Sequence, residues 1–198
     1  DEQLDFVTEA EFSTEIDQEF EAQNVFADEF DQGELDKEKW YVRNVGPVRC
    51  GYHSESQVEV KDGNLIITAE YKDEALENYY SDAEEDQYRP GWYTGCITTR
   101  GKFEQCYGYY EVRCILPAAT GMWSAFWMMN EGVYNVNGSG QDGTEVDIFE
   151  SMYYKDYWWG NDAVISGIVY DGYGADKKGD SIGKVYVGGD PYNEFKTY

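Results

Sequence analysis

The chain has 198 residues, enough for one domain with a substantial core, and its apolar share of 41% excludes a disordered chain. Its formal net charge of -25, from 40 acidic and 15 basic residues, opposes binding to nucleic-acid phosphates. No run approaches the ~20 apolar residues of a membrane span, so neither nucleic acid nor membrane is an expected partner. If the substrate is a glycan, the same charge favours a neutral polymer over a sulfated one.

Residues 1–24 are acidic and poor in aromatic side chains, which predicts an arm or linker, with a short helix over 9–21 as the alternative. The composition changes at Val25, and we expect a single folded domain over 25–198. The sequence begins at Asp1, without Met and without a charged-then-apolar leader. This is expected of a processed or trimmed chain, and a signal peptide, if there is one, would precede it.

The pattern beyond Val25 is that of β-strands. Residues 57–60 alternate in polarity as a strand does, and after the turn sequence Lys-Asp-Gly-Asn residues 65–69 form a second apolar strand. This pattern predicts a hairpin. The apolar run 121–129 is too short, and too closely flanked by Gly and Asn, for a helix. Residues 71–90 are predicted to form a loop. Further strands are predicted over 96–103, 109–115, 146–149 and 163–170. Short strands at regular spacing predict an all-β fold, an antiparallel sandwich or jelly roll.

Cysteine and histidine chemistry is largely excluded. The four cysteines allow three disulfide pairings and permit an oxidising compartment. They contain no Cys-x-x-Cys pair, and His53 is the only histidine, so a zinc site and a Ser-His-Asp triad are poor interpretations. By contrast, aromatic residues make up 17% of the chain, with 19 Tyr and 6 Trp. Such rings suit a surface that binds partly polar ligands, and an aromatic-rich β core is the alternative. The cysteines are Cys50, Cys96, Cys106 and Cys114.

Three acids interrupt an apolar strand at Glu-Val-Asp-Ile-Phe-Glu, residues 145–150. Carboxylates among Val, Ile and Phe are costly unless they face a cleft or are paired. Glu145 and Asp147 share one face of a strand, whereas Glu150 falls on the other. A β-bulge between Asp147 and Glu150 would bring all three to one side, and bulges are enriched beside active sites.

Aligned carboxylates of this kind are suited to retaining glycoside hydrolysis. One ionised acid attacks the anomeric carbon, a second protonates the leaving oxygen, and a third between them orders the charges. The alternatives are a Ca²⁺ site, which would use oxygen ligands, and a solvated strand face. Ile and Phe between the acids do not fit a typical calcium loop.

The hexapeptide at 145–150 resembles the signature of glycoside hydrolase family 16 in its bulged form. Other segments resemble further motifs of this family and occur in the family's order, with Ser124 in place of the usual Pro. These segments are 25–31 with Trp40, 62–67, 107–117, 121–127 and 171–174. The resemblance implies a jelly roll with a concave substrate cleft, Glu145 as the nucleophile, Glu150 as the acid/base and Asp147 as the assisting acid.

Four further residues are substrate contacts by the same resemblance. Trp123 is expected to stack on a sugar, and Trp127 shares its strand parity, with a core position as the alternative. Arg100 and Asn44 stand where family members have polar contacts to substrate. Val169 departs from the family, because relatives with the Asp-Gly-Tyr-Gly stretch usually have His there. The chain also ends at Tyr198, where members usually continue through further strands.

The resemblance implies a secreted endo-hydrolase of a neutral β-glucan with β-1,3 or mixed β-1,3/1,4 linkages. Its partner is then a polysaccharide, catalysis requires no cofactor, and a structural Ca²⁺ with unidentified ligands is expected in many members. One alternative is a jelly-roll carbohydrate-binding module without turnover. The other is a family member that acts on xyloglucan or a galactan. The clustered carboxylates favour the enzyme, because a binding face needs rings and amides instead.

Overall fold

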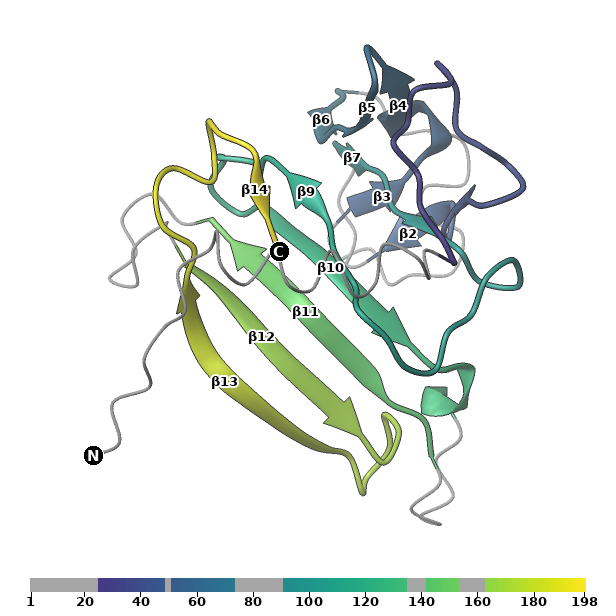
Figure 1. The fold of residues 1–198 in the computed structure, drawn as a ribbon, viewed down its shortest axis with the longest axis vertical. Helices are drawn as coiled ribbons and strands as arrows, with labels where there is room; N and C mark the ends of the chain where they lie inside the picture. Colours follow the sequence, from purple (N-terminus) through teal and green to yellow (C-terminus); the bar gives the residue numbers. More distant parts are fainter. Residues whose placement is uncertain (1–24, 49–50, 74–90, 135–141, 154–162) are drawn as a thin grey trace. The chain divides into compact units, whose positions relative to one another are not determined.

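The computed structural model of the chain describes residues 25–48, 51–73, 91–134, 142–153 and 163–198. These residues form β-strands and two short 3-10 helices (Figure 1). The chain divides into two compact units, residues 1–109 and 110–198. The predicted arm at 1–24 lies outside the described residues, and so does most of the predicted loop at 71–90. Within the described residues, no helix has the length and apolar character that a membrane crossing requires.

The first unit contains three small sheets. Strands β1 and β8 pair with each other, β4 pairs with β5, and four strands follow the order β2-β3-β7-β6. The rings of Tyr52 and Tyr93 form its buried cluster, with centroids 5.4 Å apart. Its strands are β1 (Tyr41–Val42), β2 (Gly46–Val48), β3 (Gly51–His53), β4 (Val58–Lys61), β5 (Asn64–Ile67), β6 (Glu70–Tyr71), β7 (Trp92–Thr94) and β8 (Ile97–Thr98), and the 3-10 helix η2 (Glu55–Gln57) precedes β4.

The predicted hairpin is confirmed as β4 and β5. Lys61 pairs with Asn64, so the connection is the two residues Asp62 and Gly63. Both have positive φ, 52° and 69°, as a tight hairpin turn requires. Local turn chemistry therefore determines this register.

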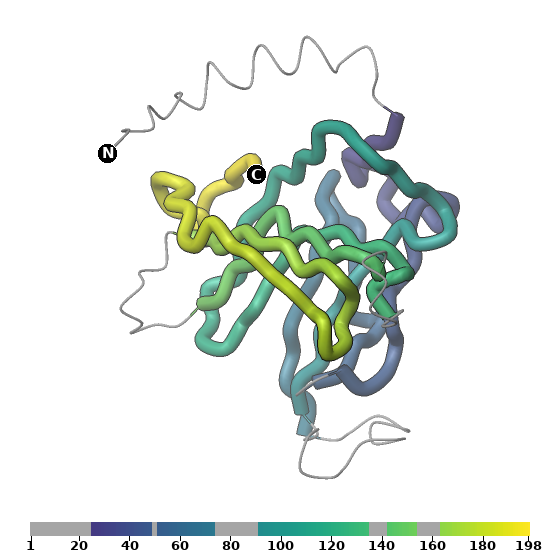
Figure 2. The backbone as a smooth tube through the Cα atoms, turned by 90° about the horizontal axis from the view of Figure 1, so that it is seen from below, coloured from purple at the N-terminus to yellow at the C-terminus, as the bar shows by residue number. Residues whose placement is uncertain are grey.

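The second unit is built on a four-stranded antiparallel sheet in the order β10-β11-β12-β13, and β9 pairs separately with β14. Figure 2 shows β12 turning back into β13 as a long hairpin. Leu116, Phe149 and Val164 are buried together in its core. The strands are β9 (Arg113–Cys114), β10 (Trp123–Met129), β11 (Glu145–Met152), β12 (Ala163–Tyr170), β13 (Lys178–Tyr186) and β14 (Lys196–Thr197), and the 3-10 helix η3 (Glu131–Tyr134) follows β10.

Several predicted strands have different lengths in the structure. The prediction over 163–170 matches β12, and 121–129 contains the strand β10. The strand predicted over 96–103 is wrong beyond Thr98, because the chain turns at Gly101, whose φ is 70°. The strand predicted over 109–115 is reduced to the two residues of β9. Residues 25–31, which resemble an opening strand, are irregular, although Phe26 stacks on Phe103 with centroids 4.6 Å apart.

Candidate active site

The carboxylate strand β11 contains the predicted bulge. Against β10, the register shifts between Phe126 and Trp127, and Ile148 has no partner. Against β12, it shifts between Asp147 and Glu150. One extra residue between these two acids restores their parity, so both face the same side of the sheet. Glu145 lies two residues before Asp147, ahead of the bulge. Because side chains alternate along a strand, Glu145 is on the same face as Asp147.

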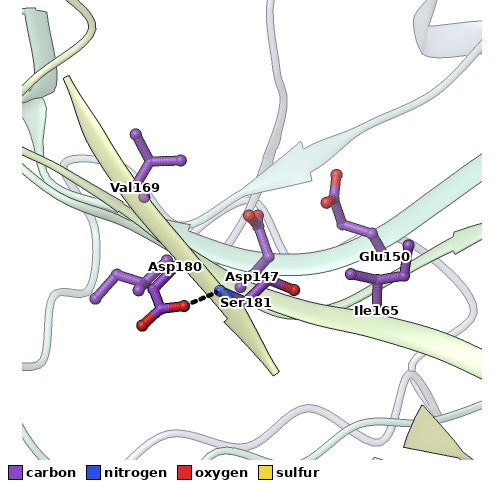
Figure 3. Close-up of a pocket in the computed structure, with 9 residues that line it drawn as sticks. Asp147, Glu150, Ile165, Val169, Asp180 and Ser181 are labelled. Carbon is purple, nitrogen blue, oxygen red and sulfur yellow. Dashed lines mark hydrogen bonds between the residues drawn. The ribbon is translucent and has the colours of Figure 1, made fainter. Parts of the chain in front are cut away.

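A solvent-open depression of about 410 Å³ adjoins two of the three acids. Figure 3 shows the side chains of Asp147 and Glu150 extending from β11 in the same direction. Gly167 pairs with Asp147 on the neighbouring strand and contributes no side chain there. Gly167 also lies where the register of β12 against β13 shifts, which is a usual place for a glycine within a strand. The lining residues are Asp147, Glu150, Ile165, Gly167, Ile168, Val169, Gly179, Asp180 and Ser181.

Asp147 has the most unusual electrostatic environment of the three acids. Its side chain is buried, with a relative exposure of 8%. Burial, together with the charges of Glu150 and then Glu145, raises the pKa of Asp147 to about 6. At neutral pH and below, this carboxyl is therefore partly protonated, and the cluster carries less than its full negative charge.

Glu145 lies at one end of the cluster and accepts a hydrogen bond from Tyr173. The donor is the phenol hydroxyl, and the acceptor is Oε2 of Glu145. Val169 pairs directly with Glu145, so an apolar side chain stands beside this acid at the position where relatives usually have His. The sequence identified the Asp-Gly-Tyr-Gly stretch only as a motif. It did not show that Tyr173 reaches an acid 28 residues earlier.

Glu150 lies at the other end and is held by Trp123. The indole Nε1 donates to Oε1 of Glu150 at 2.9 Å. Trp123 is 49% exposed, so much of its ring remains open to solvent. Trp127 pairs directly with Asp147, and directly paired residues of an antiparallel ladder share a face. The structure thus brings both tryptophans to the side of the sheet that carries the acids.

Asn44 and Arg100 belong to the first unit. Asn44 has a φ of 47° in the turn after β1, and Arg100 lies in the turn after β8. Because β1 and β8 are antiparallel, these two turns are at opposite ends of the pair. The structure does not bring Asn44 and Arg100 together, and their contact with substrate stays a prediction.

Metal binding was one of two alternatives for the three acids. Among the described residues, no three His, Cys, Asp or Glu side chains are gathered as ligands for a metal ion. The acids at 145–150 are thus not gathered in the way a calcium site would require, and a structural calcium stays a prediction. Three of the four cysteines, Cys96, Cys106 and Cys114, are described, and all three are free thiols.

Comparison with known proteins identifies the family. The family model described as "Beta-porphyranase A-D, GH16 domain" matches residues 20–180. Beta-glucanase of Rhodothermus marinus is 31% identical over 137 residues, which are 65% of this chain and 43% of that protein. Beta-porphyranase B of Zobellia galactanivorans is 28% identical over 189 residues, 87% of this chain and 58% of that protein. The chain thus spans about half the length of these relatives.

Solved structures share the fold. The crystal structure of porphyranase B from Zobellia galactanivorans has a TM-score of 0.65 at 27% identity, covering 86% of this chain and 63% of that one. That of SCLam, a non-specific endo-beta-1,3(4)-glucanase, has a TM-score of 0.61 at 27% identity, covering 88% and 62%. The fold is that of a β-jelly-roll glycoside hydrolase domain. The chain belongs to glycoside hydrolase family 16.

Proposed function

We propose that the protein is an endo-acting glycoside hydrolase that cleaves a β-glucan with β-1,3 or mixed β-1,3/1,4 linkages and retains the anomeric configuration. The observation that carries the proposal is the bulge in β11, which places Glu145, Asp147 and Glu150 on the same face of the sheet. Relatives named beta-glucanase and endo-beta-1,3(4)-glucanase support the substrate class.

The three acids divide the reaction between them. In the first step, a carboxylate oxygen of Glu145 forms a bond to the anomeric carbon, and Glu150 gives its proton to the departing oxygen. In the second step, water attacks the same carbon and loses a proton to Glu150, and the ester bond to Glu145 breaks. Asp147 lies between them, and its raised pKa of about 6 lets it share a proton with either neighbour.

The remaining groups bind the polymer. We propose that Trp123 and Trp127 present rings to sugar faces, since both share the face of the acids. Asn44 and Arg100 are proposed as polar contacts at other sugars. The carboxyls supply the acid, base and nucleophile, so we propose that no cofactor takes part. We also propose that the protein is secreted, because a polysaccharide substrate is met outside the cell.

A galactan is the second candidate substrate. The matching family model and the relative that covers 87% of this chain are both named for porphyranase activity. The formal net charge of -25 opposes a sulfated polymer, and the described residues that line the depression include no Lys or Arg. We therefore rank a neutral β-glucan first.

The test is turnover on a panel of polysaccharides. Laminarin, barley β-glucan, xyloglucan, agarose and porphyran are incubated with the protein, and new reducing ends are measured. We expect release from laminarin or barley β-glucan, and none from the same substrates with Glu145→Gln. Release from porphyran or agarose alone would replace the glucan proposal with the galactan. Binding to a polysaccharide with no release from any would instead indicate a binding module.

A further inference from the structure

The geometry points to Tyr173 as a positioning residue that holds the nucleophile Glu145 and accelerates the second step of the reaction, in which the sugar leaves this carboxylate. This inference rests on the proposed function, because it needs Glu145 to form the covalent intermediate. It concerns a residue outside the three acids, on a turn that follows β12.

The turn that carries Tyr173 contains an Asp-Gly pair. Asp171 and Gly172 have consecutive positive φ values of 61° and 68°, as Asp62 and Gly63 have in the β4–β5 hairpin. Asp tolerates a positive φ better than most residues and Gly adopts it freely, so both residues fit this turn. The carboxylate of Asp171 also forms an ion pair with Lys178 at the start of β13, with N and O 2.5 Å apart.

The backbone of the turn is anchored to two segments that precede β11, at Gly143 and at Val133 in η3. The amide of Gly172 donates to the carbonyl of Gly143 at 3.1 Å, and that of Tyr173 donates to Val133 at 2.8 Å. Gly143 lies two residues before Glu145, and a Cβ on it would be 2.1 Å from the nitrogen of Val133. Close packing at Gly143 thus links the turn directly to the start of the carboxylate strand.

The side chain of Tyr173 completes this anchoring. Its ring packs edge-on against Tyr134, with centroids 5.6 Å apart and an interplanar angle of 84°. Its hydroxyl donates to Oε2 of Glu145. Burial, followed by the hydrogen bond to Glu145, raises the pKa of Tyr173 above its ordinary value, so the phenol stays protonated as a donor. One oxygen of Glu145 is occupied by this bond, and the other is left to attack.

The two chemical steps respond oppositely to such a donor. In the first step, Glu145 loses negative charge as its oxygen bonds to the anomeric carbon, so the hydrogen bond weakens. In the second, the bond between that carbon and Glu145 breaks and its electron pair returns to the carboxylate, while water adds and its proton goes to Glu150. The hydroxyl of Tyr173 then stabilises the charge that develops on Glu145. Tyr173 therefore favours release over attack.

The experiment uses Tyr173→Phe and an activated substrate, the 2,4-dinitrophenyl β-glycoside of a β-1,3-linked glucose disaccharide. With this leaving group the second step limits kcat, whereas kcat/KM reports the first step. We expect kcat to fall about 10-fold to 100-fold, the range for a hydrogen bond to a charged group. KM should fall with it, kcat/KM should stay within about threefold of the wild type, and a burst of about one equivalent of dinitrophenolate should precede the steady state.

The matched control is Tyr186→Phe, which removes the same atom from a tyrosine at the far end of β13 that is 65% exposed. Its kinetics should equal those of the wild type. An equal loss of kcat and kcat/KM in Tyr173→Phe would indicate a merely structural role and overturn the inference, as would unchanged kinetics. If Tyr173→Phe does not fold, 3-fluorotyrosine at position 173 keeps the ring and provides a stronger donor. This variant should raise kcat and lower kcat/KM. If both parameters equal those of the wild type, the inference is overturned.

The inference and the proposed function fail in distinguishable ways. If the wild type turns over and Glu145→Ala does not, while Tyr173→Phe behaves as the wild type, only the role of Tyr173 is lost. If Glu145→Ala retains wild-type turnover, Glu145 is not the nucleophile, and both the proposed roles and the inference are wrong.

Discussion

The two ends of strand β11 hold their glutamates in different ways. At the Glu150 end, the donor is Trp123 on the adjacent strand, and the ladder from Trp123 to Phe126 is regular. At the Glu145 end, the donor is Tyr173, which reaches the acid from the turn that follows β12. One contact follows from sheet register alone, whereas the other needs several tertiary contacts. The difference suggests that the two ends are built for different tasks.

The chemistry of the donors agrees with this division. An indole N–H can only donate, so Trp123 occupies one oxygen of Glu150 and leaves the other to carry the exchanging proton. The phenol of Tyr173 is at the acid that we propose forms the covalent bond. The predictions below test whether the two ends are as distinct as their geometry indicates.

Replacing each glutamate by Ala should produce the largest effects. Glu145→Ala removes the nucleophile, and activity should be lost on every substrate regardless of leaving group. Glu150→Ala should reduce kcat/KM on natural polysaccharide by about 10²–10⁴-fold but spare kcat/KM on activated aryl glycosides, because in the first step only the sugar leaving group needs the proton. On both substrate classes kcat should fall, because the second step loses its base. Steady-state kinetics on both substrate classes measure this contrast.

Added azide provides an independent readout of the same contrast. In Glu150→Ala, azide should attack the covalent intermediate and yield a β-glycosyl azide. In Glu145→Ala, it should attack from the vacant face and yield the α-azide. NMR of the products identifies the anomer, and the reverse pattern would exchange the two roles. A loss of less than about tenfold in both variants would contradict catalysis by this strand.

Trp123→Phe should weaken the Glu150 end alone. The change removes the N–H that donates to Glu150 and keeps an aromatic face for the sugar. Because a hydrogen bond to a charged group is lost, kcat/KM on laminarin should fall about 10-fold to 100-fold. On an activated aryl glycoside it should fall less than about threefold, since proton donation is not required. Trp92→Phe, an exposed indole of the first unit, is the control. Equal losses on the two substrates would mean that Trp123 only binds sugar.

Local patterns in the sequence were sufficient for much of this site. Strand parity and the spacing from Asp147 to Glu150 predicted the bulge, and the structure confirms it. Asp62 and Gly63 predicted the β4–β5 hairpin in the same way. Both features depend on neighbouring residues and on backbone preferences that a sequence displays directly.

Other features depend on partners that are distant in the sequence. Strand β13 was not predicted, because Lys, Gly, Asp and Ser give it no apolar alternation, and pairing with β12 determines its structure. Tyr173 was not identified as a partner of Glu145, because their contact requires the positive φ of Asp171 and the close packing at Gly143. Asn44 and Arg100 came from resemblance alone, which carries no geometry for their turns.

The smallest effect that we expect is the change in stability caused by Asp147→Asn. The pKa of Asp147 is about 6 in the folded protein and near its ordinary value of 3.8 in the unfolded chain. Between these values the folded state binds the extra proton, so the free energy of unfolding falls as pH rises through this window. Above pH 6 the full penalty for the buried charge is present. Asn carries no charge, so the variant should be less active but more stable at pH 8.

The expected gain at pH 8 is about 1–2 kcal/mol, below the about 3 kcal/mol of the full shift, because the site is partly open to water. Urea unfolding at pH 4 and pH 8 measures it, and the gain should nearly vanish at pH 4. Asp176→Asn, an exposed carboxyl, should change stability equally at both pH values. The charge of Glu150 contributes more than that of Glu145 to the raised pKa of Asp147. The gain should therefore shrink more in a Glu150→Gln background than in Glu145→Gln, and the opposite order would mean that Asp147 is coupled mainly to the nucleophile's end of the strand.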